Sequence, residues 1–117
     1  MDRLQQGGDR VMVTNIDHNW FPGERMLAGV PGLYATEDIP TSDKILHLHY
    51  FIGACDWYIA ELDQDQRLAF GYVNLGDPNS AEWGYIDLNE LEAIRLGPFI
   101  VERDLYWTPR PASAVLR

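Results

Sequence analysis

The fold is decided by residues 45–87, which read ILHLHYFIGACDWYIAELDQDQRLAFGYVNLGDPNSAEWGYID. Apolar side chains recur at every second position through four segments, and this period is typical of β-strands. The four segments are residues 45–52, 57–62, 68–75 and 82–87. Only short turns separate them, so neighbouring strands have to run antiparallel, since a parallel return needs a dozen or more residues. The stretch therefore predicts a four-stranded meander.

Helical patterns flank this predicted sheet on both sides. Residues 24–33 carry apolar side chains at helical spacing, and Asp87 with Glu90 has the spacing of a capping box that opens a second helix. Residues 99–107 alternate as a final strand. We expect an α+β fold, in which an antiparallel meander sheet of four to five strands carries one or two helices packed on one face.

The length of 117 residues fits a single domain with a core of its own. We place this domain at residues 24–109, after a weakly structured lead-in over 1–23 and before a C-terminal tail over 110–117. Trp20 and Phe21, at the end of the lead-in, are expected to pack against the domain because large aromatic side chains favour burial.

Charge is distributed unevenly along the chain. There are 18 acidic and nine basic residues, and residues 54–92 hold nine of the acids with Arg67 as their one base. Such a field repels phosphates, so direct nucleic acid binding is not expected. It attracts a protein partner with a basic surface, although an acidic surface also serves simply to keep a protein in solution.

Other features bear on where the protein works. No run of 18 apolar residues is present, so we expect no membrane span, and the N-terminal residues lack the pattern of a signal peptide. Cys55 is the one cysteine and cannot form an internal disulfide, which favours the reducing cytoplasm.

Catalytic and metal-binding motifs are not apparent. The sequence contains no nucleophile elbow, phosphate-binding glycine loop or dinucleotide fingerprint. His47, His49 and Cys55 lie near one another, but they lack the spacing of a zinc site, so we predict neither a metal nor a cofactor. A non-enzymatic role is favoured, while acid–base chemistry by two carboxylates brought together by folding stays open.

Two polar segments contain candidate functional residues. The loop over residues 34–38 has Tyr34, Glu37 and Asp38 available for a ligand or partner, or for bonds to its own backbone. Arg103 lies between two acids, where it suits an ion pair with a carboxylate such as Glu37 or Glu61.

Five short segments resemble a known protein family. They lie in order across two thirds of the chain, at residues 31–38, 57–61, 69–73, 83–92 and 101–107. These pieces are similar to a family of small bacterial proteins of unknown function that are carried by plasmids, integrative elements and phages. The resemblance implies a shared fold and a mobile-element setting, and it implies no reaction.

The sequence leaves three hypotheses open. The first is an acidic protein-binding module, in its sharpest form an inhibitor of a host defence nuclease of the anti-CRISPR or DNA-mimic type. The second is a small ligand-binding domain or enzyme with a concave pocket formed by Tyr34, Glu37, Arg103 and nearby acidic residues. The third is a homodimer joined through an edge strand or an aromatic face. The candidate partner-binding residues are Tyr34, Glu37, Asp38, Asp56, Glu61, Asp63, Asp65, Glu82, Glu102, Arg103 and Asp104.

Overall fold

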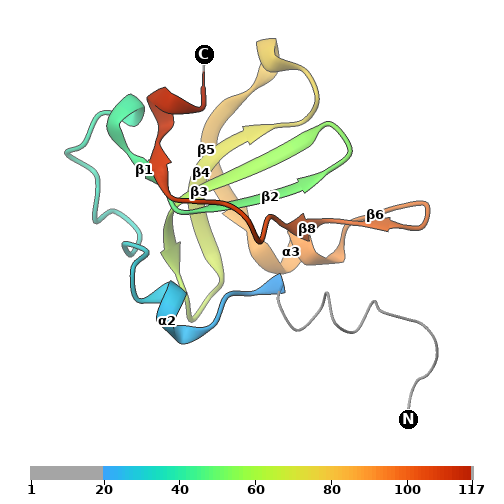
Figure 1. The fold of residues 1–117 in the computed structure, drawn as a ribbon, viewed down its shortest axis with the longest axis horizontal. Helices are drawn as coiled ribbons and strands as arrows, with labels where there is room; N and C mark the ends of the chain where they lie inside the picture. Colours follow the sequence, from blue (N-terminus) through green and yellow to red (C-terminus); the bar gives the residue numbers. More distant parts are fainter. Residues whose placement is uncertain (1–19, 117) are drawn as a thin grey trace.

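A computed structural model describes residues 20–116, and its centre is a five-stranded antiparallel sheet (Figure 1). The strands are β2 (Leu48–Ile52), β3 (Cys55–Asp63), β4 (Leu68–Asn74), β5 (Glu82–Asp87) and β8 (Glu102–Arg103). Their order across the sheet is β5-β4-β3-β2-β8. The predicted meander is therefore confirmed, with β8 added beside β2.

Shorter elements surround the sheet. Two pairs of two-residue strands form separate ladders, β1 (Ile45–Leu46) with β9 (Arg110–Pro111) and β6 (Arg95–Leu96) with β7 (Phe99–Ile100). The helical elements are α2 (Glu24–Leu27), α3 (Leu88–Ala93) and the 3-10 turns η2 (Thr41–Asp43), η3 (Pro78–Ser80) and η4 (Ala112–Ala114). Over residues 20–116 the fold is mostly strand, with the two small helices α2 and α3.

Several predicted boundaries differ from the structure. The strand expected over residues 45–52 breaks at His47, because β1 turns away to pair with β9. The strand expected over 99–107 is wrong: β7 folds back on β6, β8 pairs with β2, and a turn follows. Residues 110–114, assigned to the tail, form β9 and η4, and the Ala112 amide donates to the Lys44 carbonyl over 2.9 Å.

The helices are shorter than their sequence patterns suggest. α2 is a single helical turn that ends at Leu27, and turns follow it within the stretch of residues 24–33 that has helical spacing. The start of α3 agrees with its predicted cap, because the Asp87 carboxylate accepts hydrogen bonds from the Asn89 amide over 2.9 Å and the Glu90 amide over 3.2 Å.

The main core lies on one face of the sheet. It gathers the inward side chains of β2, β3, β4 and β5 with Leu27 of α2 and Leu88 and Leu91 of α3. Trp20 closes it: its indole donates to the Val101 carbonyl over 2.8 Å, and its own carbonyl accepts from the Tyr50 hydroxyl over 2.8 Å. This confirms that Trp20 packs on the domain. The rest of the expected lead-in, residues 1–19, lies outside the described residues.

A smaller cluster covers part of the opposite face, hereafter the outer face. Leu46, Ala60 and Ala112 are buried there, with Tyr58 and Trp107 packed against them. The C-terminal segment around η4 is thus fixed against β3 and is part of the packed structure.

One extra residue in β3 sets which side chains reach the outer face. Ile59 pairs with Gly71 and Glu61 pairs with Phe70, so Ala60 is a β-bulge opposite no partner of its own. Ile59 before the bulge and Leu62 after it both lie in the main core. The bulge therefore places Glu61 on the outer face, beside Phe70.

Candidate functional site

A buried carboxylate organises the loop that crosses the outer face. Glu61 is only 3 % exposed, and its side chain accepts hydrogen bonds from the Tyr34 amide over 2.8 Å and the Thr36 amide over 3.1 Å. The Thr36 hydroxyl donates to the same carboxylate. Glu61 therefore acts as an acceptor for loop residues 34–36, which are otherwise held by turns.

Lys44 is the counter-charge of this carboxylate. Lys44 is only 5 % exposed, and its ammonium lies 3.8 Å from a Glu61 oxygen and donates to both the hydroxyl and the carbonyl of Thr36. Burial by itself would raise the pKa of Glu61, but the hydrogen bonds from Thr36 and Tyr34 and the charge of Lys44 outweigh it and hold that pKa below its usual value. Glu61 is thus ionised and internally compensated.

Tyr34 has an uncommon backbone conformation next to this network. Its φ is +70°, in the left-handed region that few non-glycine residues adopt. The hydrogen bond from its amide to Glu61 fixes that conformation. As a result the Tyr34 side chain stands outward and is 59 % exposed.

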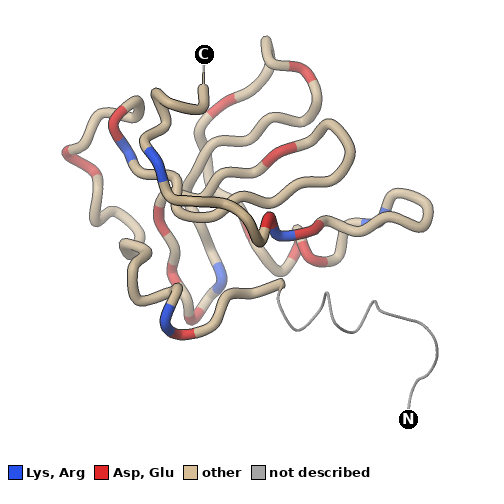
Figure 2. Tube along the Cα trace, viewed as in Figure 1, with Lys and Arg blue, Asp and Glu red and all other residues tan. Residues whose placement is uncertain are grey.

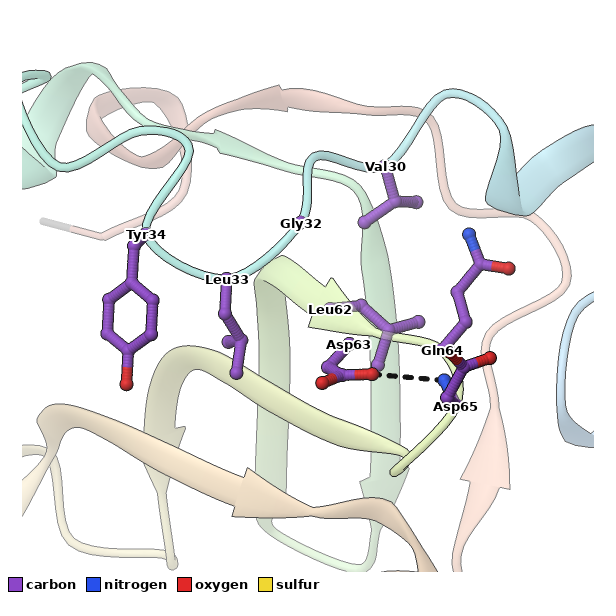
Figure 3. A pocket seen from close by; sticks show the side chains of 8 residues that line it. All are labelled: Val30, Gly32, Leu33, Tyr34, Leu62, Asp63, Gln64 and Asp65. Carbon is purple, nitrogen blue, oxygen red and sulfur yellow. Dashed lines mark hydrogen bonds between the residues drawn. The ribbon is translucent and has the colours of Figure 1, made fainter.

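Tyr34 separates two hollows on the surface. The first, the Asp63 hollow, has a volume of about 590 Å³ and contains Asp63 and Asp65 in its wall (Figure 3). Its remaining lining residues are Val30, Gly32, Leu33, Tyr34, Leu62 and Gln64. In Figure 3 the Asp63 carboxylate faces the hollow and accepts a hydrogen bond from the Asp65 amide over 3.1 Å.

The second hollow, the Glu61 pocket, has a volume of about 360 Å³. Its lining consists of Tyr34, Glu37, Ile39, Pro40, Thr41, Lys44, Glu61, Phe70 and Tyr85. A hydrogen bond with Tyr34 raises the pKa of Tyr85, with smaller contributions from burial and from Glu61 and Glu37. We call the two hollows together the Tyr34 face.

A separate polar cluster lies around His49. Its Nε2 is 2.7 Å from an Asp56 oxygen and its Nδ1 is 3.0 Å from an Asp104 oxygen, while its ring stacks on Tyr58 at 4.6 Å. Each ring nitrogen lies within hydrogen-bond distance of a carboxylate, so the imidazole bridges Asp56 and Asp104. Burial by itself would raise the pKa of Asp104, but the hydrogen bonds from His49 and the Tyr106 amide outweigh it and hold that pKa below its usual value. The cluster fastens the segment after β8 to β2 and β3.

The structure brings together only some of the residues selected from the sequence. Tyr34, Glu37, Glu61, Asp63 and Asp65 form the Tyr34 face. The others are distributed elsewhere: Asp38 is exposed on the same loop, Glu82 is exposed on β5, Asp56 and Asp104 bind His49, and Glu102 is exposed on β8.

Arg103 lies away from this face. It is in β8, at the far edge of the sheet, and its guanidinium contacts the Met26 sulfur at 3.4 Å. The base that faces Glu61 is Lys44 instead. The expected pocket therefore contains Tyr34 and Glu37 without Arg103.

Sequence reasoning missed six residues that line the Glu61 pocket: Ile39, Pro40, Thr41, Lys44, Phe70 and Tyr85. Phe70 and Tyr85 were visible as strand residues, and they pair directly across β4 and β5. The residue-by-residue pairing of β3, β4 and β5 would have been needed to place them beside Glu61. Nothing in the sequence around Lys44 indicates that its ammonium is buried.

The histidines and the cysteine do not assemble into a metal centre in the described part of the chain. No group of three His, Cys, Asp or Glu side chains among residues 20–116 is placed to hold a metal ion. Within the same residues no helix is long and apolar enough to cross a membrane.

Comparison with known proteins identifies the family. The chain belongs to the family described as protein of unknown function (DUF2958), whose model matches residues 34–115. No curated protein and no solved structure matches the chain. The match begins at Tyr34 and includes all of the Glu61 pocket together with Asp63 and Asp65.

Proposed function

We propose that this protein is a non-enzymatic module that binds a protein partner with a basic surface through the Tyr34 face. The observation that supports it is the make-up of the two hollows, which share Tyr34 and carry Glu37, Asp63 and Asp65. In the described part of the chain, Lys44 is the one base in their lining, and its charge is compensated by Glu61. The face thus keeps a net negative charge.

The walls of the Asp63 hollow suit lysine and arginine side chains. Val30, Leu33 and Leu62 supply apolar surface, and Asp63 and Asp65 supply carboxylates next to it. Lysine and arginine combine an apolar stem with a cationic head, so they match a hollow of this kind at both ends.

Charge around the Tyr34 face favours the same kind of partner. Figure 2 shows acidic positions along loop residues 37–43 and toward the end of β3. Among the described residues, Glu37, Asp38, Asp43, Asp63 and Asp65 form no ion pair with a base. Complementary charge raises the association rate more than the final affinity, so binding should weaken with salt.

In a finer form of the proposal, this protein is encoded by a mobile element and acts in the bacterial cytoplasm. There it inhibits a host defence nuclease, as an anti-CRISPR or DNA-mimic protein does. This finer form receives less support from the geometry. Asp56 and Asp63 stand at opposite ends of β3, roughly 20 Å apart at about 3.3 Å per residue. The acids of β3 and the loop after it are the candidates to substitute for phosphates. Asp56 is bound to His49 and Glu61 is buried, so only Asp63 and Asp65 are available for that role.

An arginine-rich peptide tests the proposed binding by calorimetry. We expect the Asp63→Asn/Asp65→Asn variant to bind it about three- to tenfold more weakly than the native protein, since exposed charge pairs contribute up to about 1 kcal/mol each. Native binding should also weaken between about 50 mM and about 200 mM salt. The matched control, Asp77→Asn/Glu82→Gln, removes two exposed acids at the β4–β5 loop and should change little.

Equal weakening in both variants would show that charge alone attracts the peptide, and it would overturn the assignment to the Tyr34 face. Light scattering of the protein by itself tests the rival hypothesis of a homodimer. A dimer that dissociates in the Asp63→Asn/Asp65→Asn variant would replace the basic partner with a second copy.

A further inference from the structure

We infer that the Glu61 pocket accepts a single arginine side chain of the partner. This inference rests on the proposed function and identifies the chemical group that the pocket recognises. It depends on the size of the pocket, the orientation of its aromatic rings and its charge.

The size of the pocket fits one side chain. Its volume of about 360 Å³ lies at the small end of the range of roughly 300–1,000 Å³ for ligand sites. Its lining includes Ile39, Pro40 and Thr41 from the loop before β1, and Phe70 and Tyr85 from β4 and β5. Apolar atoms of these residues can cover the stem of an inserted side chain.

Aromatic rings provide the attraction for a cation. The Tyr34 and Tyr85 ring centroids are 6.5 Å apart with the rings at 62°, and Phe70 meets Tyr85 at 5.4 Å and 65°. The three rings thus present faces in different directions around one small space. A cation within about 6 Å of such a ring face is stabilised by about 0.5–1 kcal/mol at an exposed site.

The charge of the pocket also favours a cation. The Lys44 ammonium is 6.0 Å from the Phe70 ring centroid, but it is engaged by Thr36 and compensated by Glu61. Glu37 is exposed at the pocket and has no ion pair among the described residues. The pocket as a whole therefore carries one uncompensated negative charge.

Arginine suits this environment better than lysine does. A guanidinium is planar and weakly hydrated, so it stacks on aromatic faces at a smaller cost of desolvation. The same molecule already contains two such contacts, with Arg67 at 4.1 Å from the Phe21 ring and Arg110 at 4.0 Å from the Trp107 ring.

Capped tripeptides test the inference by amide chemical shifts in NMR spectra. We expect Gly-Arg-Gly at millimolar concentration to shift the amides of Tyr34, Glu37, Phe70 and Tyr85. The same peptide with citrulline, which keeps the shape and lacks the charge, should bind at least about threefold more weakly, as should the norleucine peptide. Equal binding of the citrulline peptide, or tighter binding of Gly-Lys-Gly, would overturn the assignment to arginine.

Variants at exposed positions localise the binding. Tyr85→Ala and Glu37→Gln should each weaken the Gly-Arg-Gly peptide severalfold, and Tyr85→Phe should keep its binding because the ring remains. The matched control is Tyr106→Ala, which removes a fully exposed tyrosine far along the chain from this pocket. If Tyr106→Ala weakens the peptide as much as Tyr85→Ala does, the pocket is not the site.

The two proposals fail in different ways. If the arginine-rich peptide depends on Asp63 and Asp65 but is unaffected by Tyr85→Ala and Glu37→Gln, the pocket inference is wrong and the proposed function stands. If Gly-Arg-Gly binds in the pocket but no substitution on the Tyr34 face weakens binding of the arginine-rich peptide, the proposed function is wrong and the pocket inference stands.

Discussion

Replacing Glu61 with alanine should strongly destabilise the protein. The change removes the carboxylate that pairs with the buried Lys44 side chain, and it removes the acceptor for the Tyr34 and Thr36 amides. Breaking a buried ion pair by removing one partner costs about 3–5 kcal/mol. We expect the free energy of unfolding to fall by that amount, which is a large part of the total for a domain of this size.

Urea unfolding followed by tryptophan fluorescence measures the effect, since Trp20 and Trp57 are buried in the main core. The Lys44→Met/Glu61→Leu variant removes both charges and should be more stable than Glu61→Ala alone, because no buried charge is left unpaired. Glu82→Ala, at an exposed position, is the control and should change stability by less than about 0.5 kcal/mol. A loss below about 1 kcal/mol in Glu61→Ala would refute the reasoning.

Three further predictions concern stability. Folding lowers the pKa of Asp104, so its carboxylate stabilises the folded protein at pH values above the unfolded pKa of 3.8, and this stabilisation is lost as the pH falls through the lower folded pKa. The Asp104→Asn variant should therefore show a flatter dependence of stability on pH in that acid range, measured by urea unfolding. Gly71→Ala places a methyl group 1.8 Å from the Tyr58 carbonyl oxygen and should cost about 3 kcal/mol or more, whereas Gly84→Ala, across the ladder in open space, should be tolerated; thermal melts of the two variants compare them. Trp20→Phe leaves a buried carbonyl without its donor and should cost about 1–3 kcal/mol in the same melts, and unchanged melting would contradict the role of that hydrogen bond.

The strands were predictable because buried and less buried side chains alternate along them, as the apolar and polar residues do in the sequence. In β2 the alternation of buried Leu48, Tyr50 and Ile52 with half-buried His49 and Phe51 agrees with the sequence pattern. The α3 cap was predictable for a local reason, since Asp87 binds amides within three residues.

The break at His47 could not be predicted from local pattern. β1 leaves the sheet because its partner is β9, at the other end of the domain, and no periodicity within residues 45–52 contains that information. The strand predicted over 99–107 failed for a related reason: β7 pairs with β6 while β8 pairs with β2, and the local alternation does not contain this change of partner at Val101.

The candidate site was half predictable. Tyr34 and Glu37 were recognisable as polar residues of a loop, and the structure places both in the lining of the Glu61 pocket. The partner of Glu61 was not recognisable, because Arg103 and Lys44 are equivalent by charge and only the folded structure places Lys44 beside Glu61 and Arg103 at the far edge of the sheet. Partners of a buried charge depend on tertiary packing, which composition does not contain.

The bulge at Ala60 also bears on how the length of this strand can vary among relatives. Deleting Ala60 would restore regular alternation and leave Ile59, Glu61 and Leu62 facing the sides they face now. A one-residue deletion or insertion between residues 55 and 59 would exchange the Glu61 carboxylate and the Leu62 side chain across the sheet, placing a charge among apolar side chains. Position 60 is therefore the point in β3 where a one-residue length difference is least damaging.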